Sequence, residues 1–296
     1  MSMADTIWII LAIDVIPALF TVIGNAVFFI TFLRTRSLHT PSNVLLWFLS
    51  LIDLVVGTVC QPLFIFTLFK EHGPCCTVAV KIYNIVFGLT CWNSLVCVAL
   101  VTIDRFLAIF FPFQYKEKAS CKTVACIFLF VFVVSSMYTV LVMIFYETAR
   151  ISFIIFDLVF QLLILALILA VYASIYRVMF RLMRSTQPQC RPNSKSVQQS
   201  QIVERKKTIT LSMIIGAFLI CYSPYIAYSV KSLLYYLGKT GFSSSFGMWA
   251  NFFFLLKSSI NPLIYCLRRN DIRQAACRAI KLHTPSSNLK SKETTF

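Results

Sequence analysis

The sequence predicts an all-α membrane protein: a seven-transmembrane helix bundle with a short amphipathic helix on the inner membrane surface. Of its 296 residues, 58% are hydrophobic and only 13% are charged, and the mean hydropathy of +0.80 is far above the range of soluble domains. Seven apolar runs are long enough to cross a bilayer core, which takes about 20 helical residues. They differ from the alternating segments of roughly ten residues that form a β-barrel, which is therefore excluded.

The seven runs lie near residues 7–33, 42–69, 77–110, 119–146, 151–180, 208–237 and 246–266. Prolines interrupt four of them, at Pro17, Pro62, Pro224 and Pro262, which a bundle tolerates because neighbouring helices satisfy the freed backbone groups. The predicted organisation is a seven-transmembrane domain over 1–266, an amphipathic juxtamembrane helix over 267–281 and a disordered tail over 282–296.

Basic residues are distributed unevenly between the loops. Alternate loops and the C-terminal tail hold most of them, whereas the opposite loops hold only Lys70, Lys81, Arg150, Lys231 and Lys239. The positive-inside rule therefore predicts a multi-pass protein with its N-terminus outside and its C-terminus in the cytoplasm. In such a protein a net charge of +16 indicates orientation and contact with anionic membrane lipid, not a nucleic-acid partner.

The segment after Tyr265 predicts the amphipathic helix. Apolar residues fall near one helical face and arginines and lysines surround the rest, so we expect this helix to lie on the membrane surface. The final residues, TPSSNLKSKETTF, predict a disordered tail that offers phosphorylation sites. The terminal T-T-F could also add a strand to a PDZ domain.

Five short motifs occur in order, one in each of five spans: GN at 24–25, SLIDL at 50–54, TIDRF at 102–106, FLICYSP at 218–224 and NPLIY at 261–265. Together they resemble the set carried by rhodopsin-like (class A) G-protein-coupled receptors, over nearly the whole chain. The resemblance implies a plasma-membrane receptor that couples an extracellular ligand to nucleotide exchange on a heterotrimeric G protein. It also implies arrestin as a partner of the tail. We expect no catalytic activity, no cofactor and no metal.

The TIDRF motif places a charged pair, Asp104 and Arg105, at the inner end of the third span. An arginine that faces the bundle needs a carboxylate partner. Asp104 is one partner, and the resemblance implies Glu204 as a second, because it lies twenty residues before Pro224. Glu204 and Arg105 would then hold the inner face closed; the alternative is that Glu204 belongs to the solvated run ERKK.

The sixth span carries the next part of the expected switch. Pro224 removes a backbone hydrogen bond and predicts a kink. The resemblance assigns a switch role to Tyr222, where the family usually has tryptophan, and to Phe218 one turn inward. Ile168 stands where the family usually has a proline in span five.

The seventh span completes the switch. By resemblance, Tyr265 after Asn261-Pro262 is a tyrosine that moves inward on activation, and Tyr176 on span five is its expected counterpart.

Lys257 lies four residues before Asn261 and therefore shares its helical face. In opsins the retinal lysine stands six residues before this asparagine, where this chain has Leu255. The resemblance places Lys257 in a polar core cluster that holds sodium in the family, made here of Asn25, Asp53, Ser94, Lys257 and Ser258. We expect Lys257 to act as a built-in counter-ion to Asp53; the alternative is a lysine that extends into water without a fixed partner.

Ten residues should converge near the outer side as a ligand pocket: Gln61, Asn84, Phe87, Cys91, Asp157, Gln161, Tyr225, Ser229, Asn251 and Phe252. For each of them, helix packing or interhelical hydrogen bonding is an equal alternative. The ligand could be a small molecule, a lipid or a peptide. Phe87 stands where amine receptors carry an aspartate, which argues against biogenic amines.

Three features of the chain narrow the subgroup. The very short loop between spans four and five lacks a cysteine, span five lacks the proline usual in the family, and the start of span six reads RKKTITLSMIIGAF. Together these features resemble the melanocortin, adenosine, cannabinoid and lysophospholipid receptors. Other functions remain as alternatives. An opsin-like photoreceptor is disfavoured by Leu255, a transporter by the absence of an inverted repeat, and a ligand-independent, constitutively active receptor stays open.

Overall fold

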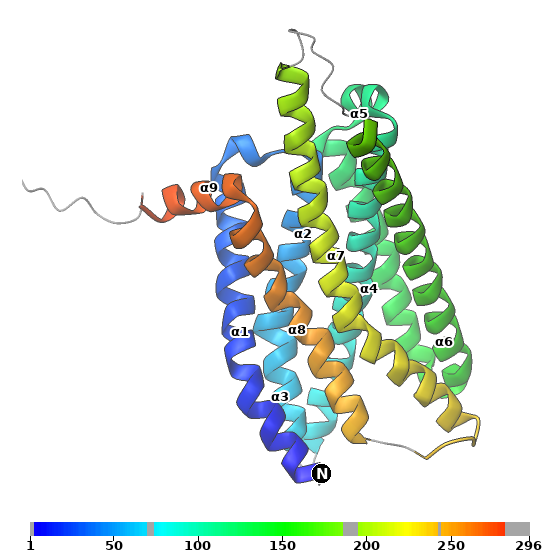
Figure 1. Ribbon diagram of the computed structural model, residues 1–296. Coiled ribbons are helices and arrows are strands. Elements are labelled where there is room, and N and C mark those ends of the chain that lie inside the picture. Colours follow the sequence, from blue (N-terminus) through cyan, green and yellow to red (C-terminus); the bar gives the residue numbers. More distant parts are fainter. Residues whose placement is uncertain (1–2, 70–73, 186–194, 242–243, 282–296) are drawn as a thin grey trace, which may run out of the picture.

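The computed structural model describes residues 3–69, 74–185, 195–241 and 244–281, and the side chains at several ends of these ranges, including 195–207, lie outside the description. Every regular element in the described part is helical, which confirms the predicted fold class. Figure 1 shows the helices packed lengthwise in one bundle.

The seven spans follow the chain in order. The first is α1 (Met3–Arg34), and the second is α2 (Pro41–Val55), continued by a π-helical segment, η2 (Val56–Cys60), and by α3 (Gln61–Phe69). The third is α4 (Pro74–Phe110), and the fourth and fifth form one long helix, α6 (Cys121–Ser185). The sixth and seventh are α7 (Lys195–Tyr236) and α8 (Ser244–Arg268).

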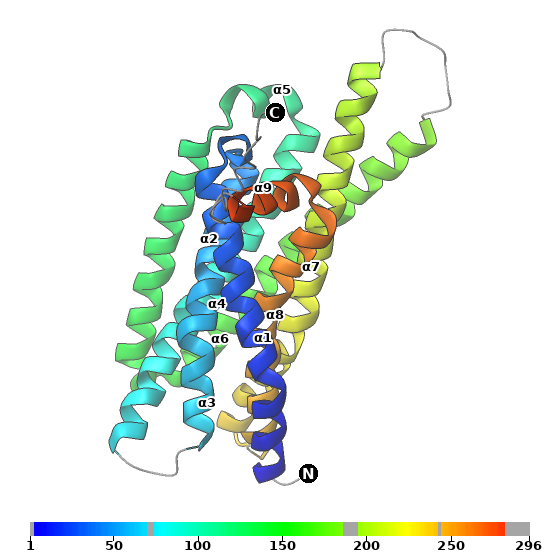
Figure 2. The same cartoon turned by 90° about the vertical axis from the view of Figure 1, so that its left-hand side faces the viewer.

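Three short helices lie at one end of the bundle. They are η1 (Arg36–Leu38), α5 (Pro112–Lys118) and α9 (Asn270–Lys281). Figures 1 and 2 show α9 lying across the bundle at this end, called here the α9 end, with the N-terminus at the opposite, N-terminal end. The first turns of α7 project beyond the other helices at the α9 end (Figure 2).

Six stretches of the described residues are long and apolar enough to cross a membrane: Asp5–Arg34, Pro41–Leu68, Val78–Phe110, Cys121–Tyr146, Thr148–Val178 and Thr208–Tyr236. The predicted seventh span, α8, is less apolar because it carries Lys257, Ser258, Ser259 and Asn261, all of them buried. It packs against α1 and α7 inside the bundle. Its polar residues therefore face other helices, as polar groups at membrane depth should.

Helix α6 contains two spans joined by a very short connection. Its helical geometry breaks at Ala149, with φ −129° and ψ 31°, so the chain reverses direction there. Its outer faces carry exposed Phe130, Ile144 and Leu163. Exposed apolar side chains on long helices are suited to lipid contact, and their exposure shows that α6 lies at the periphery of the bundle.

Gly24 marks a close approach of α1 and α8. A methyl group built on Gly24 would lie 2.6 Å from Cβ of Pro262, whereas one on Gly216 would have nothing within 4 Å. We expect Gly24→Ala to lower the thermal unfolding midpoint of the solubilised protein, because the two backbones must separate. Gly216→Ala is the matched control and should leave the midpoint unchanged or raise it, since alanine is the better helix former. Equal midpoints in both variants would contradict this packing.

Candidate functional site

A fully buried carboxylate, Asp53, lies at the centre of the polar core. One of its oxygens, Oδ1, accepts a hydrogen bond from Ser258 Oγ at 2.6 Å, and Oδ2 accepts one from Asn261 Nδ2 at 2.8 Å. These bonds join α2 to α8. Both oxygens of the carboxylate are therefore satisfied, which a charged group at this depth requires.

Lys257 lies beside this carboxylate and is only 2% exposed. Its Nζ is 3.9 Å from Asp53 Oδ1 and donates a hydrogen bond to Ser94 Oγ at 3.1 Å. The ammonium also lies over the ring of Phe254, 4.5 Å from its centroid, and 5.7 Å from that of Phe218. The carboxylate, a hydroxyl and two aromatic faces thus surround the positive charge.

The polar core links four helices. Asn25 on α1 donates through Nδ2 to the carbonyl oxygens of Ser258 at 3.0 Å and of Thr21 at 2.8 Å. With Asp53, Ser94 and Lys257, the structure brings together all five residues of the expected cluster. This cluster does not fit a sodium ion, because the Lys257 ammonium already occupies the cation position next to Asp53.

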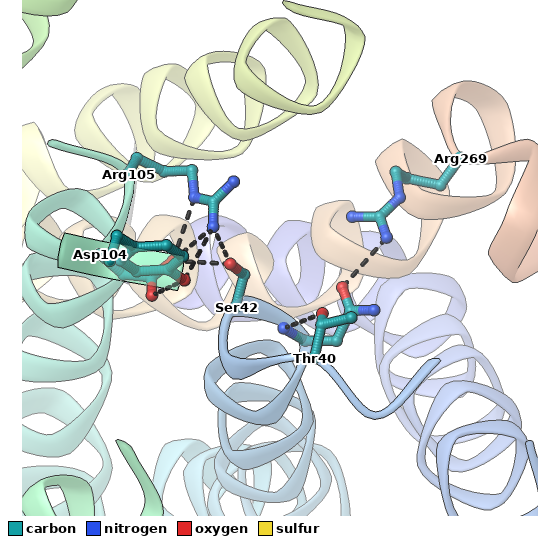
Figure 3. A network of polar contacts seen from close by, with 7 residues as sticks. Thr40, Ser42, Asp104, Arg105 and Arg269 are labelled. Atoms are coloured by element: carbon teal, nitrogen blue, oxygen red, sulfur yellow. Dashed lines mark hydrogen bonds and ion pairs between the residues drawn. The ribbon is translucent and has the colours of Figure 1, made fainter. Parts of the chain in front are cut away.

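A second network surrounds Arg105, which is 4% exposed, at the α9 end of α4 (Figure 3). Its guanidinium bonds Asp104 Oδ2 through Nη2 at 2.6 Å and through Nε at 3.1 Å, and it also donates to Ser42 Oγ. Ser42, near the start of α2, donates to the same Asp104 oxygen at 2.6 Å. The arginine is thereby attached to both α2 and α4.

Tyr115 on α5 completes this network. Its hydroxyl donates to Asp104 Oδ1 at 2.7 Å and lies 3.5 Å from Arg105 Nη2. Burial, and next the charge of Asp104, raise the pKa of Tyr115 to about 12. The hydroxyl therefore stays protonated at neutral pH and can keep donating to the carboxylate.

A neighbouring contact ties α9 to α2. Arg269 donates through Nη2 to Asn43 Oδ1 at 3.0 Å (Figure 3). It also pairs with Asp271 at 2.7 Å. Burial alone would raise the pKa of Asp271, but the hydrogen bond and charge of Arg269 lower it below its usual value. Thr40 caps α2 by accepting a hydrogen bond from the Asn43 amide at 3.4 Å.

A cavity of about 400 Å³ opens between these networks. Its lining includes Arg105, Tyr115, Lys116, Arg269 and, from α7, the buried Leu211. Helix α7 thus forms one wall of the cavity, so a displacement of α7 would widen it.

The expected switch residues of α7 and α8 are buried except Pro224, which is half-buried. Phe218 and Tyr222 stack with ring centroids 5.2 Å apart, and Tyr222 Oη lies 3.6 Å from Cys91 Sγ. Pro224 is inside α7, and Pro262 inside α8 contacts the Gly24 position of α1. Tyr265 is 1% exposed and packs on Phe28, with centroids 4.9 Å apart.

Tyr176, the expected counterpart of Tyr265 on activation, lies on an exposed side of α6 in this structure, and the pairing stays a prediction. It is 69% exposed, whereas Tyr172, one turn earlier, packs on a buried cluster to which several helices contribute, including Ile168 of α6 itself and Tyr222 of α7. Helical residues four apart are offset by about 40° around the axis, and this offset separates the partly buried Tyr172 from the exposed Tyr176. Ile168, where the family usually has a proline, is fully buried.

The residues of the expected ligand pocket separate into groups. Phe87, Cys91, Tyr225 and Phe252 pack in one buried aromatic cluster, which also contains Phe254. Ser229 hydrogen-bonds the carbonyl of Tyr225, Asn251 is partly buried, and Gln161 is buried on α6. Asn84 is exposed on α4 and does not join them, because it lies about 100° around the helix from the buried Tyr83 that precedes it.

Two acids near the pocket have partners on other spans. Asp157 accepts a hydrogen bond from Tyr138 at 2.6 Å, so it links the two halves of α6. Gln61 donates to Asp14 of α1 at 3.1 Å. Asp14 was missed in the sequence analysis, although it is the one acid inside the first apolar run.

Other network members were also missed. Ser42, Asn43, Tyr115 and Arg269 carried no signal in the sequence because each is polar and lies near a loop. The expected partner Glu204 lies in the backbone of α7, but its side chain is outside the described residues.

A model of one protein family, 7 transmembrane receptor (rhodopsin family), matches residues 24–265. The chain is similar to the trace amine-associated receptor 365 of Petromyzon marinus, with 26% identity over 90% of this chain and 78% of that receptor. It is also similar to the alpha-2B adrenergic receptor of Talpa europaea, with 28% identity over 43% of this chain. That match spans only about a third (32%) of the adrenergic receptor.

Proposed function

We propose the following role for this chain, which belongs to the rhodopsin family of seven-transmembrane receptors. It is a G-protein-coupled receptor, and its ligand binds between the helices at the N-terminal end, which faces the outside of the plasma membrane. Binding displaces α7 at the α9 end, where a heterotrimeric G protein enters from the cytoplasm and exchanges its nucleotide. The chain itself performs no catalysis and needs no cofactor.

The observation that carries this proposal is the buried network of Arg105. The guanidinium is held by Asp104 and Ser42 beside a cavity of about 400 Å³, and these bonds stabilise the closed bundle. When the cavity opens, the same charged donors can bind a protein that enters it. A ligand shifts such an equilibrium only if it binds one state better than the other. A partner that binds the opened state would therefore stabilise it.

Nucleotide exchange tests the proposal directly. Purified receptor in lipid nanodiscs should accelerate uptake of a labelled, non-hydrolysable GTP analogue by a heterotrimeric G protein, relative to empty nanodiscs. Acceleration without any ligand would identify a constitutively active receptor. No acceleration with any G-protein subtype would contradict the proposal. Absorbance after addition of retinal should stay that of free retinal, because the fully buried Leu255 stands at the lysine position of opsins.

Tyr115→Phe should raise basal exchange. The change removes the hydrogen bond of 2.7 Å to Asp104 but keeps the ring, so it weakens the closed network by about 1.5–3 kcal/mol, the usual contribution of a bond to a charged group. Basal exchange at matched receptor concentration is the measurement. Tyr235→Phe on α7, far along the chain from this network, is the control. Basal exchange equal to the unmodified receptor would show that Tyr115 does not hold the closed state.

Glu204 remains a hypothesis as a second partner of Arg105. Helix α7 forms a wall of the cavity through Leu211, seven residues beyond Glu204 and thus about two turns along the same helix. The spacing places the two residues near one face. This supports a contact between Glu204 and the Arg105 network in the closed state.

The aromatic cluster around Phe87 limits which ligands the receptor can bind. Phe87 packs on Tyr225 and Phe254, with centroids 5.5 and 4.8 Å apart, and offers no charge at the position where amine receptors carry an aspartate. The names of the relatives nevertheless refer to adrenergic and trace amine receptors and not to the melanocortin, adenosine, cannabinoid and lysophospholipid cluster. An amine ligand would therefore need an acid elsewhere in this chain.

Further partners follow from the ends of the chain. The amphipathic α9, with exposed Arg273 and buried Ile272, is suited to the surface of the inner leaflet and its anionic lipid. Arrestin and a PDZ domain remain proposals for the tail at 282–296, which lies outside the described residues.

A further inference from the structure

We propose that Asp14, Gln61 and Tyr83 bind the ammonium group of a small organic amine at the N-terminal end of the bundle. The inference rests on the proposed receptor function, for which it names the ligand class and the recognition site. The three residues come from α1, α3 and α4, and each is at least nine-tenths buried.

The site is separate from the polar core around Asp53. Asp14 precedes Asn25 by eleven residues on α1, which corresponds to about 16 Å along the helix. Gln61 follows Asp53 by eight residues on the second span. Both displacements lead toward the N-terminal end, where a ligand from outside would arrive.

Several polar atoms of the site have no hydrogen-bond partner in the part of the chain that the structure describes. Gln61 Nε2 donates to Asp14 Oδ1 at 3.1 Å, which leaves Asp14 Oδ2, Gln61 Oε1 and the Tyr83 hydroxyl without a hydrogen-bond partner among the described residues. The Tyr83 ring lies 5.9 Å from that of Phe64, which follows Gln61 by three residues on α3, so Tyr83 is next to the segment that carries Gln61. Two of the three atoms are pure acceptors. The missing partner must therefore supply several N–H or O–H groups.

The charge of the site is also unbalanced. Within the described residues no lysine, arginine or histidine lies within ion-pair distance of Asp14, whereas Asp53 and Asp104 each have a cation. An unpaired carboxylate at membrane depth is costly, so such groups are rare unless they serve binding or transport. A ligand ammonium supplies both the missing charge and the missing donors.

The walls next to the acid select the rest of the ligand. The Tyr83 ring lies 5.9 Å from that of Phe64 and 5.4 Å from that of Phe87, which continues to Phe254 at 4.8 Å. Aromatic faces attract a cation and pack on an apolar body. The chemistry of these groups therefore favours an amine with an aromatic or alkyl group, whose charge pairs with Asp14 of α1 and not with a residue at the Phe87 position of α4.

Thermal unfolding of the purified full-length receptor tests this binding without a G protein. Phenethylamine, a cation at neutral pH, should raise the unfolding midpoint in a concentration-dependent way, because a ligand that binds the native state stabilises it. Its neutral counterpart 2-phenylethanol, with the same aromatic body, should not. Equal stabilisation by both compounds, or none by phenethylamine, would overturn the proposal.

Asp14→Asn should weaken the apparent affinity for phenethylamine at least tenfold, as expected for loss of a charged hydrogen-bond partner. Asp5→Asn, the same change at an exposed position of α1, is the matched control and should stay within twofold. Without amine, the Asp14→Asn midpoint should equal or exceed that of the unmodified receptor, because asparagine can keep the Gln61 contact and removes a buried charge. A lowered midpoint with unchanged amine affinity would show that Asp14 is only structural.

A second variant keeps the test valid if Asp14→Asn does not fold. Tyr83→Phe removes one hydroxyl from the site and should weaken amine affinity at least threefold, while an unchanged affinity would remove Tyr83 from it. Nucleotide exchange separates the two proposals. Asp14-dependent binding without any exchange would contradict the receptor function alone, whereas exchange without Asp14-dependent binding would contradict the amine site alone.

Discussion

Arg105→Ala is expected to abolish receptor-stimulated nucleotide exchange, to less than about a hundredth of the unmodified rate. The guanidinium is the charged group that the closed network holds at the α9 end through Asp104 and Ser42, and alanine removes its charge and all of its side-chain donors. Losing one hydrogen bond to a charged group costs about 1.5–3 kcal/mol of binding free energy, and losing all donors of the guanidinium costs more. The measurement is exchange in nanodiscs at matched receptor concentration.

Two controls accompany this variant. Arg273→Ala removes the same charge from an exposed position of α9, where the guanidinium bonds only Asn270 at 3.0 Å among the contacts described, and it should leave exchange near the unmodified rate. Arg105→Lys keeps the charge but loses the forked geometry, so it should retain a small part of the activity. Undiminished exchange by Arg105→Ala would remove the arginine from G-protein engagement.

Lys257→Met and Asp53→Asn are expected to destabilise the receptor singly and to compensate each other when combined. Either single change leaves a buried charge without its partner 3.9 Å away, which typically costs about 3–5 kcal/mol, whereas the double change leaves none. Thermal midpoints of the solubilised variants measure the coupling. A double variant less stable than both single ones would show that Lys257 and Asp53 do not act as a pair.

The same pair predicts how the receptor responds to sodium. Replacing sodium by N-methyl-D-glucamine at constant ionic strength should leave the exchange rate and midpoint of the unmodified receptor unchanged, because Lys257 occupies the cation position. Lys257→Met exposes the Asp53 carboxylate to ions and should acquire a sodium-dependent midpoint. A clear sodium effect on the unmodified receptor would contradict the counter-ion role of Lys257.

Much of the polar core could be predicted within single helices. Four residues separate Lys257 from Asn261, so helical periodicity alone places both on one face and separates Lys257 from Leu255. The contact between that face and Asp53 was inferred from the family resemblance, and the structure places the ammonium 3.9 Å from the carboxylate. The roles of these residues remain predictions.

Other site residues could not be predicted, because their positions depend on how elements rotate and pack. The resemblance pairs Tyr176 with Tyr265, but in this structure Tyr176 is exposed and Tyr172, one turn earlier, packs against the core. Asn84 falls on the exposed side of α4, one residue after the buried Tyr83, because packing sets which side of α4 faces the core. Tyr115 reaches Asp104 only because the short α5 packs back on α4.

The sequence by itself determined the membrane class, the order of the spans and the family, since hydropathy and short motifs are local properties of the chain. Only the tertiary structure decided which polar groups meet across helices. The contact of Asp14 with Gln61, forty-seven residues later, and the attachment of Arg105 to Ser42 have no local signal. Each depends on the rotation and depth of two helices, which the packing of the whole bundle sets.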